Sequence, residues 1–245
     1  MEVTESPARR GRMQPPTIPG PRGQTWVRAA CRFALFRYFR CEFAGAERIP
    51  AQGRLVVISN HPSYLDPFAI GWGFRERWIT WMAWQAAFGW PVVGDLITRM
   101  GAFPVDTEQP KASTFKQALA VLQAERPLGI FFEGKRSSSF GLDPPFPGAV
   151  RIALMGKAPI MPVSVAGMRR LWDPEGYPRP GKVRITYHPL IDTRNFARGE
   201  DRATRERLLT ERVSEAILSG LPPDGRHRFA EDEVPAGTRL PGFAE

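Results

Sequence analysis

Two polar stretches of the sequence contain the residue types that acid–base chemistry requires. The first, Asn60-His-Pro-Ser-Tyr-Leu-Asp66, directly follows the apolar run 54–59. An imidazole accepts protons near neutral pH, and a carboxylate five residues later can bind one ring nitrogen and leave the other to act. Because no serine or cysteine nucleophile stands at a recognisable spacing, the pair His61 and Asp66 suits direct attack by a substrate hydroxyl on an activated acyl group. The alternative is a simple helix cap at Asn60 and His61.

The second stretch, Glu133-Gly-Lys-Arg-Ser137, follows another apolar run, 128–132. Gly134 allows a close approach of the backbone, and Lys135, Arg136 and Ser137 offer hydrogen-bond donors suited to phosphate or another anion. A solvated basic turn is the alternative, although Glu133 favours a structured polar site. Both stretches follow expected strands, and ligands of α/β proteins gather at the carboxyl ends of strands.

The elements that position these stretches alternate between strand and helix. We expect a helix opening near Pro62, with His61 at its N-cap. Alternation of this kind predicts an α/β fold with a mostly parallel central sheet flanked by helices. The other expected strands are 54–59, 101–106, 128–132, 159–165 and 182–187, and the other expected helices are 113–124, 150–156 and 201–219.

The N-terminal part of the chain is strongly basic. Residues 1–40 hold eight arginines against two glutamates, with no lysine or aspartate, so six of the nine net positive charges lie there. We expect a disordered basic tail over 1–23, an amphipathic interfacial helix over 24–43, the catalytic domain over 44–225 and a flexible tail over 226–245. Packing of the 24–43 helix on its own domain is the alternative to lipid contact. The aromatic run Trp78–Trp90 likewise suits a membrane interface or the wall of an acyl tunnel, and otherwise an aromatic core.

Several classes of protein fit the composition less well. Cys31 and Cys41, expected on one helix but pointing apart, indicate no disulfide framework and a reducing cytoplasm. The longest uncharged run, 78–94, is short and broken for a membrane span, so we expect a peripheral or monotopic protein on the cytoplasmic face of a membrane. His188 and His227 stand alone, which predicts no metal site. A basic nucleic-acid-binding protein is an alternative, but no specific nucleic acid is expected because the charge beyond residue 40 is nearly balanced.

Four blocks of the sequence, in order, resemble the glycerolipid acyltransferases typified by 1-acyl-glycerol-3-phosphate acyltransferase. Residues 60–66 look like the His-x4-Asp block, and Gly101-Ala-Phe-Pro-Val-Asp106 resembles the second block. Residues 131–137 resemble the Phe-Pro-Glu-Gly-Thr-Arg-Ser block, and Ile160-Met-Pro-Val-Ser-Val165 resembles the fourth. Agreement of four ordered blocks over about residues 43–187 is far more specific than a single motif.

The resemblance implies a role for each matched residue. His61 would be the general base that deprotonates an acceptor hydroxyl, and Asp66 would orient it. Glu133, Gly134, Lys135, Arg136 and Ser137 would bind the polar head of the acceptor, and Pro162 would help to shape the acyl-donor pocket. The implied partners are membrane lipids, a lysolipid acceptor, and acyl-CoA or acyl carrier protein as donor, with no cofactor. A lipid-binding relative without turnover is a further alternative.

Two positions depart from the family pattern in ways that concern the acceptor. The second block usually ends Asp-Arg, but Thr107 follows Asp106 here, and an upstream Lys-x-Glu would fall near Trp84, in an apolar stretch. Each charge-assisted bond lost from a phosphate monoester would weaken its recognition by about 1.5–3 kcal/mol. Lysophosphatidic acid is therefore the default acceptor, and a lysolipid without a phosphate monoester is the alternative. Lys135, in place of the family's usual threonine, could compensate in part.

Overall fold

A single, mostly parallel sheet forms the centre of the molecule. The computed structural model describes residues 13–106, 111–136, 142–168 and 180–222. In these ranges the strand order is β1-β7-β6-β2-β5-β3-β4, and all neighbouring strands are parallel except β6 and β7. The strands are β1 (Cys41–Ala44), β2 (Leu55–Ser59), β3 (Thr80–Trp84), β4 (Phe103–Val105), β5 (Pro127–Phe131), β6 (Ile160–Ala166) and β7 (Val183–Tyr187). The sheet confirms the predicted α/β class.

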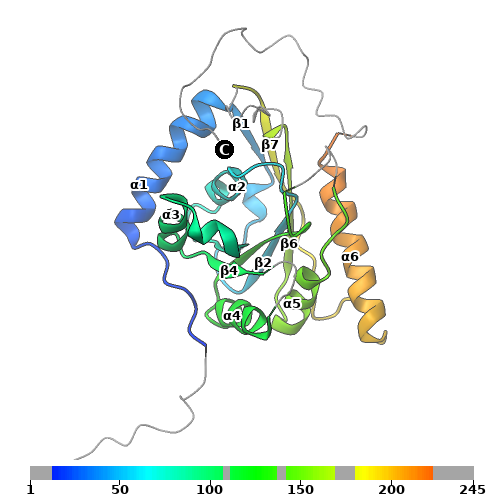
Figure 1. Ribbon diagram of the computed structural model, residues 1–245. Coiled ribbons are helices and arrows are strands. Elements are labelled where there is room, and N and C mark those ends of the chain that lie inside the picture. Colours follow the sequence, from blue (N-terminus) through cyan, green and yellow to red (C-terminus); the bar gives the residue numbers. More distant parts are fainter. Residues whose placement is uncertain (1–12, 107–110, 137–141, 169–179, 223–245) are drawn as a thin grey trace, which may run out of the picture.

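Helices cover both faces of the sheet (Figure 1). One face packs against α4, α5 and α6, and the other against α2 and the N-terminal helices α1 and η2. Figure 1 shows α1 and α6 on opposite sides of the molecule, with the strands between them. The helices are α1 (Pro21–Arg32), η2 (Phe33–Tyr38), η3 (Ala46–Arg48), α2 (Asp66–Gly73), η4 (Gln85–Gly89), α3 (Val93–Arg99), α4 (Ala112–Gln123), α5 (Gly148–Gly156) and α6 (Arg202–Ser219).

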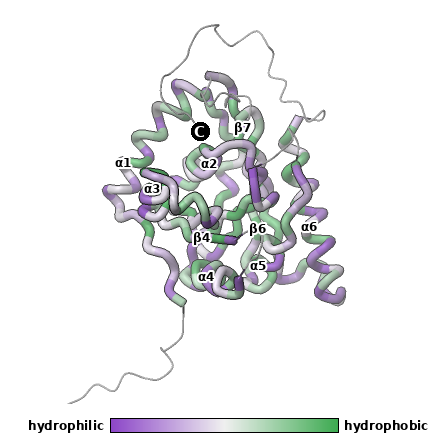
Figure 2. The backbone as a smooth tube through the Cα atoms, viewed as in Figure 1, coloured by the Kyte–Doolittle hydropathy of each residue, from purple (hydrophilic) through white to green (hydrophobic). Residues whose placement is uncertain are grey.

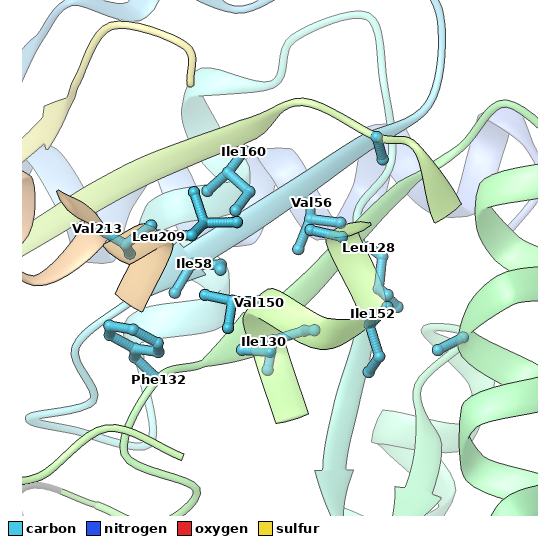
Figure 3. Close-up of a cluster of buried hydrophobic side chains, with 14 of the residues drawn as sticks. Val56, Ile58, Leu128, Ile130, Phe132, Val150, Ile152, Ile160, Leu209 and Val213 are labelled. Carbon is cyan, nitrogen blue, oxygen red and sulfur yellow. The ribbon is translucent and has the colours of Figure 1, made fainter. Parts of the chain in front are cut away.

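Strand β2 shows why the sheet needs cover on both faces. All five of its residues are buried, as expected for a central strand of a parallel sheet. Val56 and Ile58 point into the cluster with α4, α5 and α6, which Figure 3 shows, whereas Leu55 and Val57 point into the cluster on the other face. The alternation follows from the two-residue period of a strand. Packing on both faces holds β2 in place, and its last residue, Ser59, directly precedes Asn60.

The N-terminal segment is more ordered than its composition indicates. Residues 13–20 lie against the domain, where Arg126 donates a hydrogen bond to the carbonyl oxygen of Pro16 (2.6 Å) and Gln117 to that of Gln14 (3.4 Å). Helix α1 then begins at Pro21. The disorder expected over 1–23 is therefore wrong for residues 13–23, and residues 1–12 lie outside the described ranges.

The helix expected over 24–43 is also shorter than predicted. Helical structure ends at Tyr38, and Cys41 belongs to β1, which pairs with β7, so the sheet begins before residue 44. Leu35 and Phe39 are buried in the core, and the guanidinium of Arg28 in α1 donates to the carbonyl oxygen of Phe74 (2.8 Å). The segment thus packs on its own domain along one side, while Trp26 is 77% exposed on the other.

Hydrophilic and hydrophobic residues alternate along α1 and α6 (Figure 2). Among the residues that the structure describes, no helix has both the length and the apolar content that a membrane crossing requires.

Candidate active site

Asn60 turns the chain out of the sheet at the carboxyl end of β2. Its side-chain amide donates to the carbonyl oxygen of Val165 (2.9 Å) and accepts from the backbone N–H of Val165 (2.8 Å). The side chain therefore pairs with β6 as a backbone peptide would, while the backbone itself leaves the ladder. Such a buried polar residue is tolerated because both of its polar groups are satisfied. Asn60 is a structural partner of β6 and does not cap a helix.

Asp66 closes the turn that follows. Its Oδ2 accepts a hydrogen bond from the backbone N–H of Ser63 (2.7 Å) and lies 2.8 Å from Nδ1 of His61. The expected contact between His61 and Asp66 is thus present. The expected helix start near Pro62 is wrong, because α2 begins at Asp66 itself. The six residues before it form a turn held by this carboxylate, so His61 does not occupy a helix N-cap.

The environment of Asp66 fixes the state of the imidazole. Asp66 is fully buried, and burial raises the pKa of its carboxyl group, while the hydrogen bonds from His61 and Ser63 oppose that rise. When Asp66 is ionised it can only accept, so the proton then lies on Nδ1 of His61 and Nε2 is the nitrogen that can take a proton from a substrate. The His61 side chain is 15% exposed, which leaves it within reach of a ligand. Such an arrangement meets what a general base with an orienting carboxylate requires.

An aromatic stack supports the imidazole from below the site. The ring of His61 lies on that of Phe131 with centroids 3.7 Å apart and planes at 11°. Phe131 in turn lies on Trp81 at 4.8 Å, again at 11°. Because β5 is flanked by β2 and β3, Phe131 can touch a residue that follows β2 and one within β3. The stack fixes the plane of the ring, while Asp66 fixes its hydrogen bond.

Gly129 makes this stack possible, and we expect Gly129→Ala to disturb it. A Cβ at Gly129 would lie 2.3 Å from Cε3 of Trp81, in a strand where the indole cannot retreat without moving Phe131. We expect a loss of stability of about 1–3 kcal/mol, typical of overpacking, seen as a lower Tm. Because the displacement reaches His61, turnover per folded molecule is expected to fall about tenfold or more, since small misplacements of a catalytic group are costly.

Gly71→Ala is the matched control for this substitution. Gly71 lies in α2, and a Cβ there would meet no atom within 4 Å. Alanine is also the better helix former, so Tm and turnover are expected to stay at or above those of the unaltered protein. Equal behaviour of the two variants would contradict the role assigned to the stack.

The second polar stretch lies beside the first because β5 and β2 are neighbours. The N–H of Phe132 donates to the carbonyl oxygen of Ser59 (2.8 Å), and the chain then turns at Gly134, whose φ is +68°. This backbone conformation favours glycine. Glu133 is 6% exposed, whereas Lys135 and Arg136 are exposed to solvent. The turn therefore presents two cations beside the turn that holds His61.

Arg136 contacts the first stretch directly. Its guanidinium carbon lies 4.1 Å from the ring centroid of Tyr64, a cation–π contact that joins the two turns. Tyr64 was not singled out from the sequence, although it lies between His61 and Asp66. Ser137, the last residue predicted for the acceptor head, lies outside the described residues.

Pro162 belongs to β6 and to neither of these turns. It sits within β6, opposite Ile58 of β2, and its carbonyl oxygen accepts from the backbone N–H of His188 (2.9 Å). A proline has no N–H to give to the ladder, and here β7 pairing begins one residue later, at Val163. Its role toward the acyl donor stays a prediction.

Of the two positions that depart from the family pattern, the structure describes the one at Trp84. Trp84 ends β3 and pairs with Val105 at the end of β4, just before Asp106. Thr107 itself lies outside the described residues. Trp84 is 53% exposed and its ring meets that of Trp90 edge-on at 5.9 Å. The aromatic run predicted as one unit is therefore divided, since Trp81 is buried under the site and Trp84 faces solvent.

The histidines outside the site have a simpler explanation. His188 is 7% exposed, and its Nε2 lies 2.7 Å from Oγ of Ser164, which donates to the carbonyl oxygen of Ile217. It packs between β6 and α6. His227 lies outside the described residues. Within the described ranges, no group of three or more potential ligands is placed to hold a metal ion.

Comparison with known proteins gives a consistent result. A family model described as Acyltransferase matches residues 40–166, which include both turns. The chain is 35% identical over 122 residues to a 1-acyl-sn-glycerol-3-phosphate acyltransferase of Bacillus subtilis, covering 49% of this chain and 60% of that protein. It is 32% identical over 127 residues to a protein of the same name from Streptococcus pneumoniae, covering 51% of this chain and 47% of that protein. The chain thus spans less than two thirds of the length of these relatives.

A solved structure shares the fold. The crystal structure of the 1-acyl-sn-glycerophosphate (LPA) acyltransferase PlsC from Thermotoga maritima matches with a TM-score of 0.64 and 22% identity. The match covers 80% of this chain and 77% of that one.

Proposed function

Because the chain belongs to the acyltransferase family, we propose that it transfers a fatty acyl group from a thioester to a hydroxyl group of a lysolipid, with His61 as general base. The observation that carries the proposal is the contact between Nδ1 of His61 and the buried carboxylate of Asp66, at 2.8 Å, beside a turn with two exposed cations. A base of this kind is what a hydroxyl needs before it can attack an acyl group.

The proposed reaction needs no covalent enzyme intermediate. Nε2 of His61 takes the proton of the acceptor hydroxyl as its oxygen attacks the thioester carbonyl carbon. The new C–O bond forms, the C–S bond breaks, and the proton held by His61 goes to the departing thiolate. Asp66 stays ionised and stabilises the imidazolium between the two proton transfers. All atoms are accounted for by the two substrates, so the proposal includes no metal or cofactor.

We take lysophosphatidic acid as the default acceptor, which gives phosphatidic acid as product. The support is the name of the relatives together with the exposed cations Lys135 and Arg136, since guanidinium and ammonium groups suit phosphate. The donor in this proposal is acyl-CoA or acyl carrier protein. The protein would act on the cytoplasmic surface of a membrane, where its lipid substrates are found.

One observation favours a second acceptor class. Trp84 ends β3, near the place where the resemblance leads us to expect a basic residue, and its exposed indole contacts the ring of Trp90. A lysolipid with a zwitterionic, sugar or amino-acid head would need fewer cations there.

The test is acyl transfer by the full chain with labelled acyl-CoA or acyl carrier protein and a panel of lysolipids. We expect transfer to lysophosphatidic acid, inhibited by free phosphate esters. Faster transfer to lysolipids without a phosphate monoester would replace the default acceptor with the second class. Failure with every acceptor and both donors, in a folded protein, would overturn the proposed function.

A further inference from the structure

Four exposed apolar side chains and the half-buried Trp90 come from the short stretch 84–96 beside the site, here called the η4–α3 patch: Trp84, Trp90, Val92, Val93 and Leu96. Val92 is 80% exposed, Trp84 53%, Leu96 42% and Val93 39%. Single exposed apolar residues are ordinary, but adjoining ones mark interaction sites. Figure 1 shows α3 at the periphery of the molecule, on the side away from α6.

The patch is one structural unit. Helix α3 packs tightly on η4, since a Cβ at Gly94 would lie 2.2 Å from the carbonyl oxygen of Phe88. Val93 and Leu96 lie three residues apart in α3, so their side chains share one side of the helix, and Val92 directly precedes it as the N-cap residue. The Trp90 ring meets that of Trp84 at 5.9 Å.

Backbone strain exposes the most prominent member of the patch. Val92 has φ 65° and ψ −47°, and the N–H of Val93 donates to the carbonyl oxygen of Pro91 at 2.6 Å. These values describe the rarer kind of γ-turn, the one with positive φ, which is strained for any residue with a Cβ. A β-branched residue is especially unfavourable there. Strain of this kind, combined with exposure of an apolar side chain, points to a function outside the fold itself.

The patch adjoins the catalytic turn. Trp90 also meets Tyr64 edge-on at 5.8 Å, and Tyr64 carries Arg136 on its ring at 4.1 Å. A chain of contacts thus runs from the patch to the turn that holds His61 and to the cation proposed for the acceptor head.

We propose that the η4–α3 patch inserts into the headgroup region of a lipid bilayer and sets the catalytic turn at the membrane surface. The inference rests on the proposed function in one respect, namely that a lysolipid acceptor reaches His61 from a bilayer. Tryptophan beside aliphatic side chains suits this layer, where one end of the indole is apolar and the other polar. Exposed Lys135, Arg136 and Arg99 complement lipid phosphates. Against these three cations, α3 carries one acidic residue, Asp95.

The test is binding of the full chain to vesicles of phosphatidylcholine, with and without phosphatidylglycerol, measured by flotation. In the variant Val92→Asn/Leu96→Gln, two inserting side chains become polar, and asparagine accepts positive φ more readily than valine. We expect Tm to be unchanged or higher and the partition coefficient to fall about 10- to 100-fold. Leu218→Gln on α6, where leucine is 48% exposed, is the matched control and is expected to bind as the unaltered protein does.

Activity assays separate the patch from the chemistry. With a short-chain acceptor dissolved as a monomer, we expect the double variant to keep its rate, while its rate on acceptor embedded in vesicles falls with binding. Unchanged vesicle binding would overturn the proposal, as would equal losses on both acceptors. A loss confined to acyl carrier protein as donor would instead make the patch a docking site for that acidic protein, and would also overturn it. Vesicle binding is measured without turnover, so it tests the proposed insertion of the patch even if no acceptor is acylated.

Discussion

Replacement of His61 by alanine is expected to lower kcat by about 10²–10⁴-fold, the usual contribution of a general base. His61 contributes to the fold through its partly exposed ring and its contacts with Asp66 and Phe131. The loss of the imidazole should therefore leave the sheet intact. We expect an unchanged circular dichroism spectrum and a KM for the acyl donor within a few-fold, because the base acts in the transition state more than in binding.

His188→Gln is the matched control for His61→Ala. His188 is buried and bonded to Ser164 on the α6 side of the sheet, so its loss should lower Tm. The kcat of His188→Gln per folded molecule should equal that of the unaltered protein. The two variants are thus expected to separate activity from stability. Activity of His61→Ala within threefold of the unaltered protein would rule out the mechanism, whatever the acceptor.

Five of the seven described strands, all except β1 and β3, and the pair at residues 61 and 66 could be predicted because their signals are local. Runs of buried aliphatic residues such as 55–59 and 160–166 indicate central strands by composition alone. Since the carboxyl ends of parallel strands meet at one edge, the two polar stretches were expected to lie together, and the contact between Tyr64 and Arg136 joins them.

The start of α2 was predicted too early because the decisive interactions are not helical ones. Pro62 is a common first residue of a helix, so the sequence pattern favours a start there. The carboxylate of Asp66 instead binds the N–H of Ser63, and Asn60 pairs with β6 more than a hundred residues away. These bonds hold residues 60–65 in a turn, which neither propensity nor spacing indicates.

Strand β3 and the aromatic stack were missed because aromatic residues suit several environments. Thr80–Trp84 lies in a run that fits a membrane interface as well as a strand. Only its neighbours in the sheet separate Trp81, which is buried, from Trp84, which is exposed. Gly129, inside an otherwise aliphatic strand, is the one local sign of the stack, since an isolated glycine in a strand often marks a close approach.

Asp66→Asn is the substitution that tests the second member of the pair. Asparagine has nearly the same shape, so the turn should still close on the N–H of Ser63. The amide oxygen, in the place of Oδ2, can still accept from both Ser63 and Nδ1, but it carries no charge to stabilise the imidazolium that forms when Nε2 takes a proton. Loss of a charge-assisted bond worth about 3 kcal/mol alone gives about 10²-fold. We therefore expect kcat to fall about 10²-fold or more.

The stability of the Asp66→Asn variant, unlike its kcat, is not expected to fall. Burial raises the pKa of Asp66, so the folded protein holds this proton more tightly than the unfolded chain does. The fold therefore loses stability as pH rises through the pKa of the unfolded chain, about 3.9, and then through the higher pKa of the folded protein. Above both pKa values, the ionised carboxylate destabilises the fold by its full amount. A neutral amide has no buried charge and so avoids this destabilisation. The Tm of Asp66→Asn at high pH should therefore equal or exceed that of the unaltered protein. Thermal unfolding between pH 5 and pH 9, with kcat measured on the same samples, checks both expectations. If the variant is inactive and also much less stable, the main role of Asp66 is to hold the turn together and not to orient His61.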